Sequence, residues 1–453
     1  MPDVFTICCN QVKSEYIIKV KHAVGCSDHL GVGEAVYLHI KNGYFSSIGN
    51  SIPDPDSQIQ LIDESDKTAL PGLIDMHVHL TRQEPGAGIN LAPLYLAHGV
   101  TSVRDVGSDL QEIKRLRSRI ESGELPGPHV YFCGPQLNGK CFRPGMCNLQ
   151  TLEETLKTVR TLRDGGVHAL KIYDQLLPDL AQTAIKEASQ SDIPVCGHLG
   201  KTSAQEAIDF GISGIEHLTS LAFDLFAGEP RNPFSPDVFR RVAAVDFNGS
   251  AAHKLSDAAI NSRVYIDPTL VVYDRILRFP ELQRTALDMP ALPKVLASYW
   301  RERMGKFTLG WQTDDYATGQ KSFEKLKSWL STIQRRGALI CAGTDTPNPY
   351  LIPGQSLLDE IRLLADAGLS TRDAIGAATK VAAAALQKSD EIGTLESGKR
   401  ADFLLVEGDP LKDISAIEKI TAVFKNGVRY APQDLERVAT ELSSVQENWQ
   451  QTN

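Results

Sequence analysis

The feature that most constrains the fold of this chain is a regular alternation of short apolar runs and longer amphipathic stretches between Leu73 and Thr344. The apolar runs read as buried strands, and stretches of helical length such as 108–121 and 152–164 separate them. The eight runs are 73–79, 100–105, 129–133, 169–173, 194–198, 214–217, 264–268 and 339–344. Alternating strands and helices form parallel βαβ units, and eight units close into a (β/α)8 barrel. We therefore predict an α/β fold built on a TIM barrel.

A different pattern flanks the predicted barrel on both sides. Residues 16–20 and 35–40 read as strands, and Asn42-Gly43 is a hairpin signal. Residues 390–430 again read as strands and turns. We predict that the N- and C-terminal segments combine into a small β-sandwich domain. The expected division is 1–70 with 390–430 for this β-domain, 71–389 for the catalytic barrel and 431–453 for a C-terminal tail.

Composition limits the partners of the chain. It has 453 residues, 42% of them hydrophobic and 23% charged, and a net charge of -9. This balance, without a basic run, predicts a small-molecule substrate and disfavours nucleic acid or a membrane as partner. No stretch has the length of a membrane span or the pattern of a signal peptide, which predicts a cytoplasmic protein. Homo-oligomer formation stays open.

The cysteines indicate a reducing compartment. The chain has 8 of them and no CxxC pair, which is typical of free thiols. For Cys141 and Cys147, in the loop after the third predicted strand, a disulfide or a ligand pair is the alternative. Two unlinked thiols are the favoured interpretation.

The first predicted strand carries the clearest chemical signal. It follows a Pro71-Gly72 turn and ends in His77 and His79, one residue apart. Side chains alternate along a strand, so both imidazoles lie on one face. Neutral imidazoles are the commonest protein ligands of zinc and similar ions. The pair therefore predicts half of a metal site.

Polar residues at the ends of other predicted strands complete this site. They are Lys171 on the fourth, His198 on the fifth, His217 on the sixth and Asp345 after the eighth. Barrel enzymes keep their active sites at the carboxyl ends of their strands. Asp105 and Asp267 also lie near strand ends, and we interpret them as structural. His98, His129 and His168 fall toward the opposite end of the barrel and are also read as structural.

Five motifs together resemble a known family. They are PGLIDMHVH at 71–79, GVTSVRD at 99–105, GIEH at 214–217, AGTDT at 342–346 and GTLESGKRADF at 393–403. With them, the chain resembles the amidohydrolase superfamily of metal-dependent hydrolases from about residue 35 to 430. Within it, the chain is most similar to the imidazolonepropionase-related and prolidase-like branch.

The resemblance implies a role for each site residue. His77 and His79 would bind the more buried metal, His198 and His217 the more exposed one, and a carboxylated Lys171 would bridge both. Asp345 would ligate the first metal and carry the proton. Zinc is the expected cofactor, as one or two ions, and manganese, cobalt and iron suit the same ligands.

The implied reaction is attack of a metal-bound hydroxide on a carbonyl. The expected substrate is an amide, either peptide-like or an N-acyl amino acid, or a related cyclic amide or ester. A mononuclear deaminase or a lactonase of the same superfamily is the alternative. A deaminase usually has a glutamate shortly after a ligand histidine, and neither His198 nor His217 is followed by one. A non-catalytic scaffold is disfavoured because all the ligands are present.

Substrate recognition is expected in loops. Arg143, in the loop after the third strand, is a candidate for binding a substrate carboxylate. Tyr173 is a candidate for binding the substrate or stabilising the oxyanion. The long connection 271–336 before the eighth strand predicts a lid that selects bulky apolar substrates. Its large aromatics are Trp300, Trp311, Tyr316 and Trp329.

Overall fold

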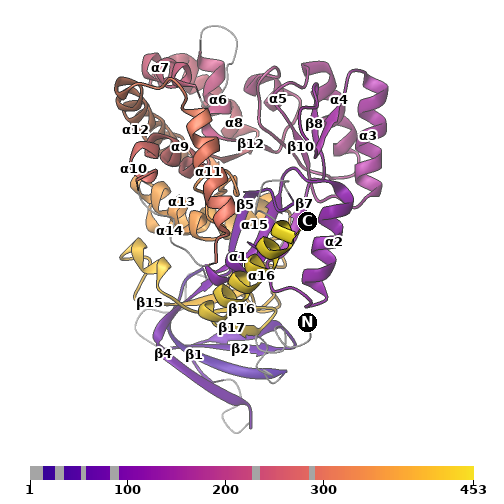
Figure 1. Cartoon of the computed structure of the whole chain (residues 1–453). Coiled ribbons are helices and arrows are strands. Elements are labelled where there is room, and N and C mark those ends of the chain that lie inside the picture. Colours follow the sequence, from indigo (N-terminus) through magenta and orange to yellow (C-terminus); the bar gives the residue numbers. More distant parts are fainter. Residues whose placement is uncertain are drawn as a thin grey trace.

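The chain forms a barrel of parallel strands above a smaller sheet (Figure 1). The computed structural model describes residues 14–25, 35–52, 58–81, 91–226, 235–284 and 291–452. The barrel strands are β5 (Leu73–Val78), β6 (Val100–Asp105), β7 (His129–Phe132), β8 (Gln136–Asn138), β10 (Leu170–Ile172), β11 (Val195–Gly197), β12 (Gly214–Glu216), β13 (Tyr265–Asp267) and β14 (Leu339–Ile340). All eight predicted strand positions are occupied, and the α/β barrel is confirmed.

The third barrel position is shared by two short strands. β7 pairs with β6, and β8 then pairs with β10 through Leu137 opposite Ile172. A third short strand, β9 (Met146–Asn148), adds to β8 outside the barrel. The pairing of β8 with β9 joins the two ends of the loop 139–145.

The barrel closes between its first and last strands. Val78 forms a parallel bridge with Thr346, just beyond β14. The amide of Asp345 donates to the carbonyl of His77 over 2.7 Å. Closure therefore places Asp345 directly beside the His77 strand end.

Helices cover the outside of the barrel and close its ends. They are α1 (Ala92–Ala97), α2 (Leu110–Glu121), α3 (Leu152–Asp164), α4 (Pro178–Ser189), α5 (Ala204–Asp209), α6 (Leu218–Ala222), α7 (Pro236–Ala244), α8 (Ser250–Asn261), α9 (Leu270–Leu277), α10 (Phe279–Leu282), α11 (Lys294–Phe307), α12 (Thr313–Arg335), α13 (Gln355–Asp366), α14 (Thr371–Ala377) and α15 (Lys380–Ala385). Side chains cap several of them, as at α3, where Thr151 and Glu154 form a reciprocal capping box. α9 to α12 occupy the long connection between β13 and β14.

The second sheet combines both ends of the chain, as predicted. Its order is β17 (Val428–Tyr430), β16 (Ile420–Lys425), β15 (Phe403–Glu407), β4 (Gln60–Pro71), β1 (Glu15–Ala23), β2 (Val36–Lys41) and β3 (Tyr44–Gly49). The sheet folds over a core of its own, in which Phe45 contacts Phe403 with ring centroids 5.5 Å apart. The division of the chain into domains at residues 70 and 390 stays a prediction.

Two Asn-Gly turns shape this sheet. Asn42 and Gly43 have φ of 52° and 84°, and Asn426 and Gly427 have φ of 50° and 70°. A two-residue hairpin of this type needs positive φ at both central positions, which asparagine and glycine adopt at low cost. The hairpin predicted at Asn42-Gly43 is confirmed between β2 and β3.

The predicted C-terminal tail forms a helix, α16 (Pro432–Thr452). Its Leu435 is buried against Leu96 and Ala97 of α1, so the first turns of the helix pack on the barrel (Figure 1). None of the described helices combines the length and the apolar character that crossing a membrane requires.

The described cysteines are all free thiols. They are Cys133, Cys141, Cys147, Cys196 and Cys341. The prediction of unlinked Cys141 and Cys147 is therefore confirmed. Cys8, Cys9 and Cys26 lie outside the described residues.

Candidate active site

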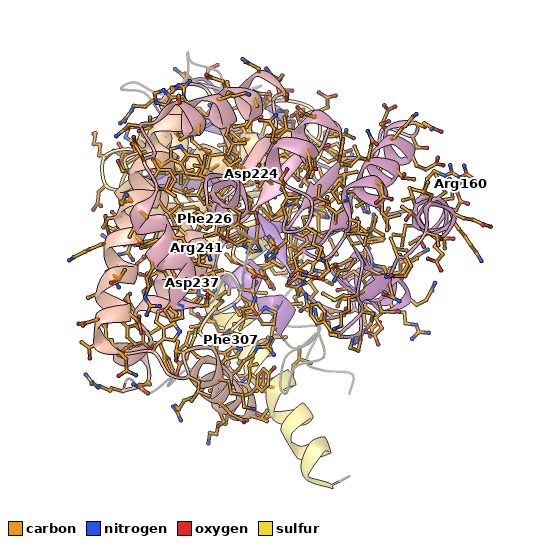
Figure 2. All side chains as sticks on the ribbon, turned by 90° about the horizontal axis from the view of Figure 1, so that it is seen from above. Arg160, Asp224, Phe226, Asp237, Arg241 and Phe307 are labelled. Carbon is orange, nitrogen blue, oxygen red and sulfur yellow. The ribbon has the colours of Figure 1, made fainter. Side chains whose placement is uncertain are left out.

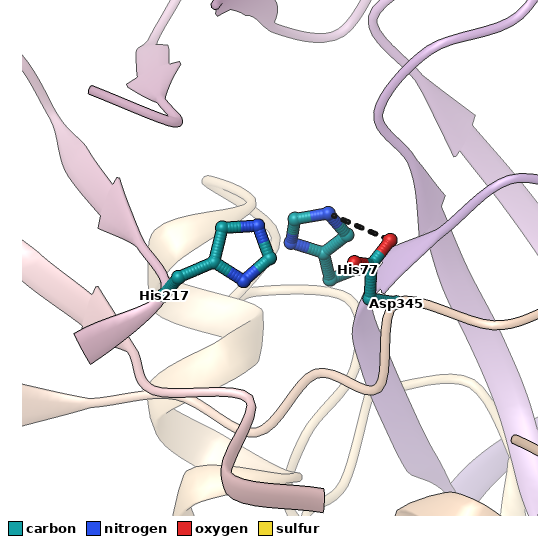
Figure 3. Close-up of side chains that lie close together, drawn as sticks. All are labelled: His77, His217 and Asp345. Atoms are coloured by element: carbon teal, nitrogen blue, oxygen red, sulfur yellow. Dashed lines mark ion pairs between the residues drawn. The ribbon is translucent and has the colours of Figure 1, made fainter. Parts of the chain in front are cut away.

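The first predicted histidine pair lies against Asp345 at the carboxyl end of the barrel. Nε2 of His79 is 3.0 Å from Oδ1 of Asp345, and Nε2 of His77 is 3.6 Å from the same oxygen. One potential ligand atom from each of His77, His217 and Asp345 lies within 4.8 Å of the others (Figure 3). Strands that are far apart in the sequence therefore bring nitrogen and oxygen ligands to one point.

The second predicted pair lies beside the first. The ring centroids of His198 and His217 are 4.5 Å apart, and those of His217 and His77 are 4.8 Å apart. Nδ1 of His217 is hydrogen-bonded to Oγ1 of Thr269 over 2.7 Å. This bond orients the ring and leaves Nε2 as the nitrogen for a ligand contact.

Three residues at this end of the barrel have left-handed backbone conformations. The φ angles are 63° at His217, 46° at Thr269 and 60° at Asp345. Such angles cost about 1–3 kcal/mol for residues other than glycine and concentrate at functional sites. Here the three angles accompany the turns that carry His217, its hydrogen-bond partner and Asp345.

The electrostatics suit metal binding. Burial lowers the pKa of His77 and His217, and it lowers the pKa of His198 to about 3. These imidazoles are therefore neutral near pH 7, which is the form that binds metals. Burial alone would raise the pKa of Asp345, but the hydrogen bond from His79 opposes this effect, and that pKa lies well below its ordinary value.

Lys171 lies beneath the histidines, fully buried on β10. Its Nζ has no hydrogen-bond partner among the described residues, and Oε2 of Glu216 is 3.9 Å away. A buried amine without a hydrogen bond is costly, so this position favours a further ligand or a modification of the amine. No hydrogen bond explains the buried amine of Lys171, and the nearby donor set of His77, His217 and Asp345 fits a divalent metal.

A pocket of about 330 Å³ opens above these groups. Its wall consists of His77, His79, Phe142, Arg143, Tyr173, His198, Arg303, Phe307, His217, Asp345 and Asn348. The Tyr173 ring centroid is 4.8 Å from that of His198, and the Arg143 guanidinium carbon is 5.7 Å from the Tyr173 ring centroid. Both residues predicted to contact substrate thus line the pocket with the four histidines.

Of the polar residues interpreted as structural, Asp105 and His129 have hydrogen-bond or ion-pair partners of their own, whereas Asp267 has none among the described residues. Oδ2 of Asp105 accepts from the Leu80 amide and from Oγ of Ser108, both over 2.7 Å, and so holds the loop after β5. His129 instead pairs with Asp402 at 3.1 Å, away from the pocket. Asp267 is different, because neither of its buried oxygens has a hydrogen-bond partner among the described residues.

Sequence reasoning missed Glu216, which immediately precedes His217. Its carboxylate contacts His77 at 2.7 Å and forms a second close group of ligand atoms with His77 and Asp267. A signal was available, since Gly214 and Glu216 share the face of β12 that points into the barrel, whereas Ile215 packs outward. An acidic residue in that register requires a buried partner.

The long connection before β14 reaches the pocket, but through other residues than the predicted aromatics. Arg303 and Phe307 of α11 form part of the wall. Figure 2 labels Phe307 in a view from above. Trp300 is buried and donates from Nε1 to the carbonyl of Pro347 over 2.8 Å, and Trp329 packs on Phe247. The four aromatics named from the sequence do not line this pocket, because they stabilise the packing of the helices.

The chain resembles solved structures over most of its length. The chain is similar in structure to a Xaa-Pro dipeptidase with bound methionine, with 22% identity, a TM-score of 0.68 and coverage of 92% of this chain and 100% of that one. It is also similar to a bottromycin amidohydrolase (18% identity, TM-score 0.72, coverage 96% and 91%) and to an ochratoxinase from A. niger (18%, 0.66, 92% and 96%). At these identities the likeness shows the fold.

The family follows from the sequence itself. A comparison with curated proteins finds no match. The family model described as "Amidohydrolase family" matches residues 68–231 and 324–429, which is more than half of the chain and includes every predicted ligand. Members of this family are enzymes that act on carbon-nitrogen bonds and generally bind divalent metals. This chain belongs to the amidohydrolase family.

Proposed function

We propose that this enzyme hydrolyses the amide bond of a peptide-like small molecule or an N-acyl amino acid at a divalent metal centre. The supporting observation is the convergence of His77, His79, His198, His217 and Asp345 in one pocket. A bound divalent cation supplies an acidified water molecule and polarises the carbonyl group. Zinc is the first choice for these ligands, and manganese, cobalt and iron suit them as well.

Asp345 is the proposed proton carrier. Its carboxylate is ionised, lies at the floor of the pocket and is within 3.0 Å of His79. A carboxylate in this place accepts the proton of the attacking water and returns it to the leaving nitrogen. Both transfers take place at the same two oxygens, so a single residue serves as base and then as acid.

Tyr173 and Arg143 are proposed to bind the substrate. The Tyr173 hydroxyl is a donor for the oxygen that becomes negative during attack on the carbonyl. The Arg143 guanidinium donates from one nitrogen to Oε1 of Gln136 over 3.0 Å, which fixes its orientation over Tyr173. A planar guanidinium held in this way suits the carboxylate of an amino acid product.

Lys171 is proposed to be carboxylated and to complete a two-metal centre. The carbamate forms when the neutral amine adds carbon dioxide and loses a proton, and it offers two anionic oxygens to two cations. The buried Nζ without a hydrogen bond supports this proposal. In centres of this type the two cations usually lie about 3.5–4 Å apart.

Metal content per chain tests the proposed centre. We expect about two metal ions in the wild-type protein and one or none in Lys171→Ala, because the bridging ligand is lost. Lys186→Ala, an exposed lysine on α4, is the matched control and should keep both ions. One metal ion in the wild type, unchanged in Lys171→Ala, would contradict a bridged centre.

A substrate panel tests the reaction. Dipeptides, N-acyl amino acids and lactones are incubated with the metal-loaded enzyme, and release of amino acid, acid or ammonia is measured. Release of amino acid from the first two classes is the expected result. Turnover of lactones alone, or release of ammonia alone, would replace the proposal with a lactonase or a deaminase.

A single-metal enzyme is the second candidate. It is favoured by the close group of His77, His217 and Asp345, whose potential ligand atoms lie within 4.8 Å of one another without Lys171 (Figure 3). Three protein ligands plus water are the usual arrangement of a catalytic zinc site. The metal count described above separates this candidate from the two-metal centre.

A further inference from the structure

A layer of charged side chains lies inside the barrel directly beneath the site histidines. Arg104 is 1% exposed, and Lys171 and Glu216 are fully buried. The interior of such barrels is normally filled by apolar branched side chains. Burying a charged pair costs several kcal/mol of desolvation per ion, so this layer is poorly explained as a source of stability. It calls for a specific role.

The Glu216 carboxylate divides its two oxygens between two partners. Oε1 accepts from Nη2 of Arg104 over 2.5 Å, and Oε2 lies 2.7 Å from Nδ1 of His77. The second distance is that of a charge-assisted hydrogen bond. With Oε2 as the acceptor, Nδ1 of His77 carries the hydrogen and Nε2 does not.

Arg104 holds both the carboxylate and the strand that bears His77. Besides its bond to Glu216, it donates from Nε to the carbonyl of Met76 over 2.7 Å, one residue before His77. It also donates from Nη1 to the hydroxyl of Tyr265. Arg104 therefore fixes the backbone beside His77, and its partner Glu216 fixes the ring.

The charge of this layer is consistent with an ionised acceptor. Oε1 of Glu216 faces the guanidinium of Arg104, a group that stays positively charged at any pH at which the protein is folded. Arg104 thus serves as the counter-ion of the carboxylate. An uncharged acceptor would bind the His77 ring less strongly.

We propose that Glu216 is a positioning residue for the metal centre, which fixes His77 in the tautomer with a bare Nε2, and that Arg104 is its counter-ion. Nε2 of His77 is the nitrogen on the Asp345 side, 3.6 Å from Oδ1. Partners of this kind orient a ligand histidine and raise its basicity, which strengthens metal binding. The inference rests on the metal centre of the proposed function but not on its substrate.

The affinity for zinc tests the inference. Zinc dissociation constants are measured by competition with a chromophoric chelator for the wild type, Glu216→Gln and Glu187→Gln. We expect Glu216→Gln to bind the metal ~10- to 100-fold more weakly. Glu187 on α4 is the matched control, because it is also a buried carboxylate paired with an arginine, accepting from Nε of Arg160 of α3 over 2.7 Å. Its variant should keep the affinity of the wild type.

A second measurement separates positioning from general damage to the fold. Nitrogen chemical shifts of the histidines in the metal-free protein report the tautomer of His77, whose signals are assigned by their loss in His77→Gln. The wild type should show a protonated Nδ1, and Glu216→Gln should show a mixture of tautomers. If Glu216→Gln does not fold, Arg104→Lys replaces it, with the same expected directions in tautomer and affinity.

The outcomes distinguish this inference from the proposed function. A protonated Nε2 in the wild type, or unchanged zinc affinity and tautomer in the variant, would overturn the inference and leave the metal centre standing. A wild-type protein that binds no divalent metal would overturn the metal centre itself, and the positioning role with it.

Discussion

The floor and the rim of the pocket are built in different ways. On the floor, Glu216 and Lys171 lie on strands and are fully buried, and Glu216 contacts His77 at 2.7 Å. At the rim, Phe142 is 56% exposed on the loop after β8, and Phe307 lies on α11, in the longest connection of the barrel. From this difference we expect the chemistry of the enzyme to depend on strand register, and its substrate selectivity to depend on the loop after β8 and on α11, which can change without disturbing the barrel.

Asp345→Asn is the change with the largest expected effect, and it tests the floor. The amide keeps the shape of the carboxylate but cannot accept a proton, so we expect kcat to fall by ~10²- to 10⁴-fold. Steady-state kinetics of the metal-loaded variant measure the loss. Asp314→Asn, at an exposed aspartate in the first turn of α12, is the control and should leave kcat unchanged. A fall of less than tenfold in Asp345→Asn would remove Asp345 from the proton transfers.

Tyr173→Phe tests the boundary between floor and rim. Loss of one oxyanion donor should lower kcat by ~10²- to 10³-fold and leave KM nearly unchanged. Tyr131→Phe is the matched control, because the hydroxyl of Tyr131 is buried inside the barrel without a hydrogen-bond partner among the described residues. If Tyr173→Phe changes KM alone, the hydroxyl binds the substrate without stabilising the transition state.

Arg143→Gln tests the rim more directly. A charge-assisted pair with the substrate carboxylate is lost, so KM should rise by ~10- to 100-fold with little change in kcat. Substrates in which the carboxylate is amidated should bind the wild type and the variant equally. The neighbouring exposed Lys140→Gln is the control for loss of a positive charge in the same loop. Equal losses for free and amidated substrates would contradict the proposed carboxylate contact.

Phe307→Ala tests the contribution of the long connection. Phe307 lines the pocket, so its truncation should lower kcat/KM by ~10-fold for substrates with a large apolar group and leave small substrates unaffected. Leu309→Ala, two residues further on and 84% exposed, should behave as the wild type. The ratio of kcat/KM for a large and a small substrate is the measurement. An unchanged ratio would show that the wall formed by α11 does not select the substrate.

The same contrast explains what the sequence could predict. Residues at strand ends can be recognised from the sequence, because a short apolar run followed by a histidine or aspartate places that side chain at the carboxyl end of a strand in any parallel barrel. The five residues taken from strand ends, His77, His79, His198, His217 and Asp345, line one pocket in the structure, and their role as ligands stays a prediction. Side-chain alternation also held along β12, where it would have pointed to Glu216 as an inward acidic residue.

The rim could not be predicted in the same way, because its residues depend on how helices pack. Trp300 and Trp329 are large aromatic residues of the kind expected in a lid, but both are buried: Trp300 donates to the carbonyl of Pro347, and Trp329 packs on Phe247. Phe307 reaches the pocket because of the direction of α11, which no local pattern encodes. The break between β7 and β8 is equally hidden, since it follows from pairing with two different neighbours.

Replacement of His168, at the opposite end of the barrel from the pocket, has the smallest expected effect. It tests whether residues at that end contribute to catalysis. Burial and the charge of Arg117 lower the pKa of His168 to about 4, so the unfolded chain takes up its proton first as the pH falls below 6.5. The free energy of unfolding of the wild type therefore decreases as the pH falls from 6.5 to 4. In His168→Gln this decrease should be about 1–2 kcal/mol smaller. Urea unfolding at pH 7 and pH 4.5 measures the difference. Activity at pH 7 should be unchanged, since His168 does not line the pocket, and a loss of activity there would extend the catalytic floor to the lower end of the barrel.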